Sequence, residues 1–394
     1  MASSHRDWAW LPINLLYSIA EKFVKFSDYK HFSAVCQRWR HHALDLATDD
    51  YKQRLRILKA CHNKLPMLMI DTKENHESDE RCLFSVTEGI TYRVQLPVPC
   101  NKRFLGSSFG WLFTVEDKTM VIILLNPFTG GAIPLPPLKD PHGDYEDYID
   151  NDPEHFVTKV VLSSDPFLSP NNYEVVVIYG GMHRLAILEC GKDSWNFVDK
   201  APFVYSDVIY YPDQGRGRGL YAVNYWRELV KIDMGSSTKE VLTKRTAADA
   251  QVAYLVQSQE GDLLLVERFW LKPDCEIFMK TWRFRVFKLL QYSTGETEAA
   301  TWVPIKSLGS QALFLGDNHS VCVSTLEFPE CLPNCIYYTA QYHIDLPPYV
   351  CHGIDEDSGI FSLEEGSFQS HYLSDPFNMN VLPPIWFVPN MKGT

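Results

Sequence analysis

The hydrophobic positions near the start of the chain have the period of a helix. Apolar residues recur three and four positions apart, which places them on one helix face. They are Leu15, Leu16, Ile19, Ala20 and Phe23. Pro12 precedes them and suits a first helical turn, because the N–H it lacks would have no partner there. We therefore predict a first helix that starts near Pro12.

A second and a third helical segment are predicted directly after it. Ser27 and Asp28 are capping residues whose side-chain oxygens accept from free backbone N–H groups, so a second helix starts there. The apolar residues on the two segments are Phe32, Val35, Cys36, Trp39 and Leu44. A module of under about 40 residues rarely builds an adequate core alone. Part of its apolar surface is therefore expected to pack on the rest of the chain or on another protein.

The period changes from helix to strand at Arg81. Residues 45–60 continue the helical pattern, and residues 62–80 are polar. From Arg81 onward, CLFSVT and ITYRVQLP alternate apolar and polar residues, which is the period of a strand. Helical patterns are almost absent from the following stretch of about 300 residues, which indicates an all-β body. The predicted domains are an all-α helical module at 7–46, a linker at 47–80 and an all-β domain at 81–390.

Strand patterns in the β domain recur in units. The units start about 45 to 55 residues apart, a spacing typical of one four-stranded blade. A sheet with two apolar faces needs neighbours on both sides, so the units must stack around an axis or pair as layers. We predict a β-propeller of about six blades, its ring closed by the segment VLPPIWFVP at residues 381–389. A pair of β-sandwiches with the same strands is the alternative.

Composition agrees with a globular protein inside the cell. Of the 394 residues, 45% are hydrophobic and 22% are charged, enough to bury a sizeable core. No run approaches the roughly 18 apolar residues that span a bilayer. The N-terminus lacks the apolar region of a secretory signal. The 10 Cys are scattered without a CxxC pair, as reduced thiols are. We expect a location in the cytoplasm and/or nucleus and no membrane association.

The net charge is divided unevenly. The formal charge of −12 separates into about +4 for residues 1–60 and about −16 for the rest. A basic helical module suits an acidic partner, and an acidic body argues against nucleic acid. The basic run at 52–59 is also explained by the solvated face of a linking helix.

One short motif resembles a catalytic one. Gly106-Ser107-Ser108-Phe109-Gly110 fits the GxSxG pattern of a serine hydrolase, in which a strand-to-helix turn raises the serine above a sheet. The sequence that follows is strand rather than helix, so we favour a Gly-rich turn at the start of a blade. A hydrolase that uses Ser107 or Ser108 is kept as an alternative.

Metal and ligand sites are not indicated by any complete motif. Zinc ligands would be Cys331, Cys335, Cys351 and His352, but a matching second pair is missing and buried thiols explain the cysteines. The acidic residues 140–155 form a solvated insertion, with a basic target segment or a cation as the alternative ligand. We expect no catalytic residue, no metal and no cofactor.

The N-terminal pattern resembles an F-box. The positions that carry the resemblance are Leu11-Pro12, Leu15-Leu16, Ile19, Val35-Cys36 and Trp39-Arg40. In that family this module binds the Skp-type adaptor of a cullin ubiquitin ligase. The resemblance implies an adaptor-binding surface made of Leu11, Pro12, Leu15, Leu16, Ile19, Val35, Cys36 and Trp39. Trp39 is expected to contribute most, because large aromatic side chains dominate such interfaces.

The order of the segments in the β domain resembles a plant family in which an F-box precedes a kelch-like domain of unknown function, numbered 295. The resemblance rests on residues 104–111, 125–130, 206–210, 313–317 and 334–337. It implies a substrate-recognition subunit of an SCF-type (Skp-cullin-F-box) E3 ubiquitin ligase. The F-box would bind the adaptor and the propeller would bind an unidentified target protein for ubiquitination. A ligase-independent scaffold is the alternative.

Overall fold

The computed structural model divides the chain into two units, residues 1–62 and 63–394. The residues of the first unit that it describes are Trp8, 11–20, Phe32, Val35, Cys36 and Trp39. Those of the second are 65–71, 80–95, 103–116, 119–126, 131–139, 156–166, 168–198, 203–213, 217–233, 238–246, 250–271, 280–294, 297–317, 319–340, 357–369 and 384–388.

The first unit contains the predicted first helix. Helix α1 spans Ile13–Ala20, and the carbonyl oxygen of Pro12 accepts hydrogen bonds from Leu15 N at 3.0 Å and Leu16 N at 3.2 Å. Pro12 therefore stands one position before the helix and accepts its first bonds. The predicted cap at Ser27 and Asp28 and the linking helix at 45–60 lie outside the described residues. No helix within the described ranges is long and apolar enough to cross a membrane.

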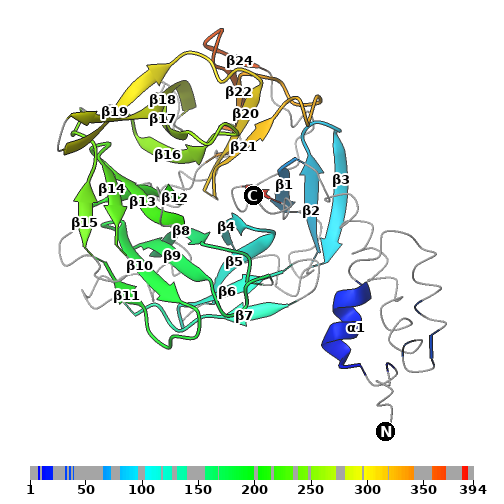
Figure 1. Cartoon of the computed structure of the whole chain (residues 1–394). Coiled ribbons are helices and arrows are strands. Elements are labelled where there is room, and N and C mark those ends of the chain that lie inside the picture. Colours follow the sequence, from blue (N-terminus) through cyan, green and yellow to red (C-terminus); the bar gives the residue numbers. More distant parts are fainter. Residues whose placement is uncertain are drawn as a thin grey trace, which may run out of the picture. The chain divides into compact units, whose positions relative to one another are not determined.

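The second unit is a ring of six sheets (Figure 1). Blade 1 contains, from the centre outward, β25 (Ile385–Phe387), β1 (Met67–Asp71), β2 (Glu80–Ser85) and β3 (Ile90–Gln95). Blade 2 contains β4 (Phe104–Ser108), β5 (Trp111–Glu116), β6 (Val121–Leu125) and β7 (Ala132–Pro134). Blade 3 contains β8 (Val157–Leu162), β9 (Glu174–Tyr179), β10 (Arg184–Glu189) and β11 (Asn196–Phe197).

The other half of the ring is built in the same way. Blade 4 contains β12 (Tyr205–Asp213), β13 (Gly217–Asn224), β14 (Leu229–Ile232) and β15 (Lys239–Val241). Blade 5 contains β16 (Val252–Gln257), β17 (Leu263–Leu271), β18 (Lys280–Thr294) and β19 (Thr297–Ile305). Blade 6 has five strands, β21 (Val321–Ser324), β20 (Gln311–Leu315), β22 (Cys335–Tyr338), β23 (Gly359–Ser362) and β24 (Ser367–Gln369). The six-bladed propeller is confirmed, and the paired sandwiches are excluded.

The ring is closed by the C-terminal strand, as predicted. Strand β25 pairs antiparallel with β1, and Trp386 stands opposite Leu68. Blade 1 therefore combines strands from both ends of the β domain. Strand β1 lies inside the segment predicted as a linker, so the β domain begins before residue 81. Its sequence MLMID is a short apolar run without alternation, and such a run does not distinguish a strand from a buried helix segment.

The core lies between neighbouring blades. Successive side chains of a strand point to opposite faces of its sheet. In β9, Val175 and Val177 belong to an apolar cluster shared with blade 2, whereas Val176 and Ile178 belong to one shared with blade 4. A strand covered on both faces must be apolar at every position, which explains the run EVVVIY.

Candidate functional site

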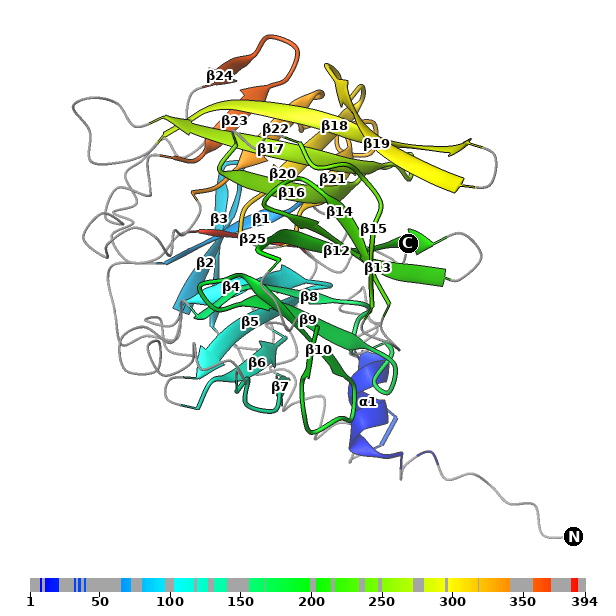
Figure 2. The same cartoon turned by 90° about the vertical axis from the view of Figure 1, so that its left-hand side faces the viewer.

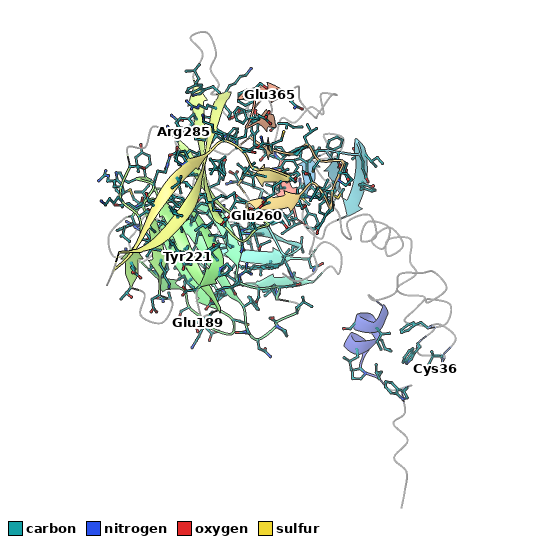
Figure 3. The ribbon with its side chains drawn as sticks, turned by 45° about the horizontal axis from the view of Figure 1, so that its top comes forward. Cys36, Glu189, Tyr221, Glu260, Arg285 and Glu365 are labelled. Atoms are coloured by element: carbon teal, nitrogen blue, oxygen red, sulfur yellow. The ribbon has the colours of Figure 1, made fainter. Side chains whose placement is uncertain are left out.

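The first unit has a small apolar core of its own. Leu16, Phe32 and Trp39 are buried, with exposed fractions of 0%, 3% and 8%. The ring centroids of Phe32 and Trp39 lie 4.7 Å apart. The partly buried side chains packed against this core are Leu11, Ile19 and Cys36, and Figure 3 labels Cys36. The core therefore links α1 to residues that follow it in the sequence.

A hydrogen bond of Trp39 ties it to Trp8, 31 positions earlier in the sequence. Its indole Nε1–H donates to the carbonyl oxygen of Trp8 at 3.1 Å. That oxygen also accepts from Leu11 N at 3.3 Å. The Trp39 backbone N–H donates to Cys36 Sγ at 3.4 Å. Trp39 is thereby fixed by both its ring and its backbone, and it joins Trp8 to Cys36.

Among the described residues of the same unit, three large apolar side chains are exposed. Trp8 is 62% exposed, Leu15 47% and Val35 53%, and Pro12 is exposed as well. Single exposed apolar residues are ordinary on a protein surface, whereas a group of them is a candidate surface for a partner. Leu15 lies on α1, next to the buried Leu16. The core described above therefore fixes the helix that carries Leu15.

The predicted adaptor-binding residues thus fall into three groups. Pro12, Leu15 and Val35 are exposed, while Leu11, Ile19 and Cys36 are partly buried. Leu16 and Trp39 lie in the core of the unit. Their side chains pack against each other and against Phe32 in this core. Trp8 was missed, although the aromatic pair in DWAW stands directly before Leu11. Contact with the adaptor stays a prediction for all of them.

In the propeller, Ser107, which stands beside the central Ser108 of the GxSxG segment, is used to close the ring. The Ser107 hydroxyl donates to the carbonyl oxygen of Trp386 at 2.6 Å and accepts from Val388 N at 3.0 Å. Phe109 and Gly110 have φ values of 52° and 77°, and they turn β4 into β5. The motif therefore lies in the predicted strand–turn–strand setting, and the Ser107 side chain is occupied by the backbone of β25.

A buried arginine joins blades 5 and 6. Arg268 is fully buried. Its Nε donates to Thr281 Oγ1 at 2.7 Å, and its Nη2 donates to Asp357 Oδ2 at 2.9 Å. The remaining acceptors are Tyr254 Oη, the Thr339 carbonyl and the Asp357 carbonyl. A guanidinium has five N–H donors, and each has a partner here. The arginine therefore has a structural role, with no donor left to bind a ligand.

A second buried ion pair joins blades 3, 4 and 5. Lys159 of β8 pairs with Asp207 of β12. The Asp207 carboxylate also accepts from Leu255 N of β16 at 2.8 Å and from Val208 N at 2.6 Å. Burial raises the pKa of Asp207 above its ordinary value, and the Lys159 ammonium opposes part of this shift. The innermost strands of three blades are therefore tied by one carboxylate.

The described residues include no group of three His, Cys, Asp or Glu side chains suited to hold a metal ion. Cys331 and Cys335 are buried, and burial raises the pKa of the Cys331 thiol to about 12. The other two proposed zinc ligands, Cys351 and His352, and the acidic segment 140–155 lie outside the described residues.

Comparison with known proteins agrees with this architecture. The family model described as KIB1-4 beta-propeller matches residues 83–362, which extend from β2 to the end of β23. The chain belongs to the KIB1-4 β-propeller family. The resemblance of the β domain to the kelch-like domain of unknown function numbered 295 stays an expectation from the sequence.

Several relatives of this chain have F-box names. "Probable F-box protein At4g22165" of Arabidopsis thaliana is 22% identical over 401 residues, with 98% of each chain covered. "F-box protein SKIP23" of the same plant is 23% identical over 425 residues, covering 98% of this chain and 97% of its own. These matches extend over both units of the chain. Among solved structures, TolB from Acinetobacter baumannii covers 82% of this chain and 66% of its own, with 11% identity and a TM-score of 0.40.

Proposed function

We propose that this KIB1-4 propeller protein is the substrate-recognition subunit of an SCF-type E3 ubiquitin ligase. The observation that carries the proposal is the exposure of Leu15 and Val35 beside a core that the unit builds for itself. An apolar surface held in this way is preorganised, which lowers the entropy lost on binding. The F-box names of the plant relatives supply the partner class, a Skp-type adaptor and through it a cullin.

The proposed mechanism is proximity. The first unit binds the adaptor, and the propeller binds a target protein. Holding the target beside a ubiquitin-charged enzyme raises its effective concentration there. No bond is made or broken by the receptor itself, so the proposal includes no catalytic residue and no cofactor. It places the protein in the cytoplasm and/or nucleus, where ubiquitin ligases of this type work.

The polar ties between the blades support a binding role for the propeller. Arg268, Asp207 and Ser107 are each engaged in contacts across a blade junction. These contacts hold the six sheets in fixed positions, and a rigid scaffold presents its surface loops in a defined arrangement.

The test compares a receptor with a ligase-independent scaffold in cells that lack the protein. If the protein is a receptor, a specific protein should accumulate in these cells. Re-expression of the wild-type chain should lower the abundance of that protein again. Proteasome inhibition should prevent this decrease. The Pro12→Ala/Leu15→Ala/Val35→Ala variant should fail to lower the accumulated protein, because all three changes fall on the exposed surface. An equal decrease with the variant, or no decrease with the wild type, would refute the receptor role.

A further inference from the structure

A line of aromatic and basic side chains follows the junction of blades 4 and 5. We call it the basic–aromatic strip, and its members are Tyr225, Trp226, Lys244, Arg245, Phe269, Leu271, Trp282, Arg283 and Arg285. They come from the turn between β13 and β14, from the segment after β15, and from β17 and β18. Blades 4 and 5 are neighbours in the ring (Figure 1), and Figure 2 shows β17 and β18 as long strands.

The blade 4 end of the strip is held by two contacts. The Arg245 guanidinium lies over the Trp226 ring, with 4.4 Å between its central carbon and the ring centroid. Thr246 N donates to the Trp226 carbonyl oxygen at 3.1 Å, which fixes the segment after β15 beside the turn. Tyr225 stands edge-on to Trp226 and is 46% exposed. A guanidinium stacked on a ring still presents its N–H edge to solvent, and that edge suits a carboxylate.

A buried ion-pair chain connects the two blades beneath the strip. Arg227 donates from Nη1 to the Tyr225 carbonyl at 2.9 Å and from Nε to Glu267 Oε1 at 3.1 Å. The other oxygen of Glu267 binds Arg285 Nη2 at 2.8 Å. The guanidinium carbon of Arg285, a residue labelled in Figure 3, lies 4.5 Å from the centroid of the Phe269 ring. Direct contacts through Arg227, Glu267 and Arg285 therefore connect Tyr225 of blade 4 to Phe269 of blade 5.

The blade 5 end is exposed and apolar. Trp282 packs against Phe269 with ring centroids 6.1 Å apart, and it is 48% exposed. Leu271 is 57% exposed. Arg283 stands opposite Phe269 in the ladder of β17 and β18 and is exposed. This end therefore offers an apolar surface with one cation at its border.

The cations of the strip differ from other lysines on the same blades. Lys231 and Lys288 are paired with Asp213 at 2.7 Å and Asp262 at 2.6 Å. By contrast, Lys244, Arg245 and Arg283 are exposed, and the part of the chain that the structure describes gives them no ion pair. Residues beyond 60 carry a charge of about −16, so acidic side chains outnumber basic ones there. On such an acidic domain, a cluster of cations without acidic partners is suited to bind the carboxylates of another molecule.

From this arrangement we propose that the basic–aromatic strip binds an acidic segment of the target protein. The inference rests on the proposed receptor function and names the class of target segment. Carboxylates of the segment would meet Lys244, Arg245 and Arg283, and one large apolar side chain would cover Trp282 and Leu271. A protein segment fits better than an anionic membrane or a nucleic acid, because the acidic body would repel an extended phosphate surface.

A random peptide library displayed on phage, panned against the purified full-length chain, tests the proposal. The selected peptides should be acidic and contain at least one aromatic or large aliphatic residue. Arg245→Glu/Arg283→Glu should weaken binding of a synthesised selected peptide by about tenfold or more, because both changes put like charges together. Raising NaCl from about 0.05 M to about 0.3 M should weaken wild-type binding as well, because exposed charges are screened.

A matched control changes the same number of charges elsewhere. Lys192→Glu/Lys306→Glu alters two exposed lysines outside the strip and should leave peptide affinity unchanged. Neutral or basic selected peptides would overturn the proposal, as would equal binding by the two double variants. Displacement of the peptide by phosphatidylserine vesicles, with direct binding of the vesicles, would assign the strip to lipid instead. The peptide assay contains no adaptor, so its result is independent of whether the first unit binds one.

Discussion

The Ser107 hydroxyl and the Trp386 carbonyl lie 2.6 Å apart, although they are separated by 279 positions in the sequence. The same hydroxyl accepts from Val388 N at 3.0 Å. The Trp386 ring is buried and donates from Nε1 to the Leu315 carbonyl of blade 6 at 2.9 Å. Strand β25 is therefore bound to blade 2 on one side and to blade 6 on the other, in addition to its pairing with β1.

Removing the Ser107 hydroxyl should loosen this closure. Ser107→Ala leaves a buried carbonyl and a buried N–H without that partner, so we expect the free energy of unfolding to fall by about 1–3 kcal/mol. Denaturant unfolding followed by tryptophan fluorescence measures the change. Ser108→Ala is the control, because its side chain is equally buried and makes no bond to β25 among the described contacts. Equal destabilisation by the two variants would contradict the closure role of Ser107.

The ion pair of Arg268 and Asp357 should show strong coupling. Removing one member of a buried pair leaves the other charge without its partner, which costs about 3–5 kcal/mol. We expect Arg268→Leu and Asp357→Ala each to destabilise the protein by that order. The double variant should lose less than the two single losses combined, because neither charge is then left alone.

The surface pair of Lys288 and Asp262 provides a comparison in the same assay. Its side chains are 42% and 27% exposed, and surface pairs contribute about 0–1 kcal/mol. The cycle Lys288→Ala/Asp262→Ala should therefore show little coupling. A coupling at Arg268 and Asp357 no larger than that of the surface pair would show that the buried network does not hold blades 5 and 6 together.

Stability should fall as the pH rises above about 9. Burial raises the pKa of Cys322 and of Cys331 from an ordinary 9.0 to about 12, and that of Tyr254 from 10.0 to about 12. Between these values the unfolded chain releases protons that the folded chain keeps. The unfolded state then binds fewer protons, so the free energy of unfolding decreases with pH.

Denaturant midpoints between pH 8 and pH 11 measure this effect. Cys322→Ala/Cys331→Ala should show a shallower decline than the wild type, because two of the titrating groups are gone. A midpoint that stays constant or rises across this range would show that these thiols titrate normally in the folded protein.

Strong local patterns in the sequence predicted several elements correctly. The apolar period after Pro12 predicted α1, and the recurring strand units predicted six blades. The run IWF near the C-terminus predicted the closing strand β25. In each case the local pattern and the tertiary structure agree, because the residues are buried on the faces that the period defines.

Other features depend on contacts between distant residues, which a pattern does not record. Strand β1 was missed because MLMID has no alternation. Strands β20 and β22 pair in parallel because β21 pairs with the other edge of β20. Neither strand sequence alone indicates this order. The packing of Trp39 with Phe32 and Leu16 also joins residues distant in the sequence, and its expected contact with the adaptor stays a prediction. A helical period identifies apolar faces but does not say which face meets a partner. The sequence did not predict the basic–aromatic strip, because its residues, such as Arg245 and Trp282, come from different blades.

The affinity of the purified chain for a purified Skp-type adaptor tests the central claim most directly. We predict a specific complex by titration calorimetry, weakened about tenfold or more in Pro12→Ala/Leu15→Ala/Val35→Ala with an unchanged circular dichroism spectrum. The strip variant Arg245→Glu/Arg283→Glu should bind the adaptor as the wild type does. Absence of a complex with the wild-type chain, or equal affinity for the triple variant, would contradict the account.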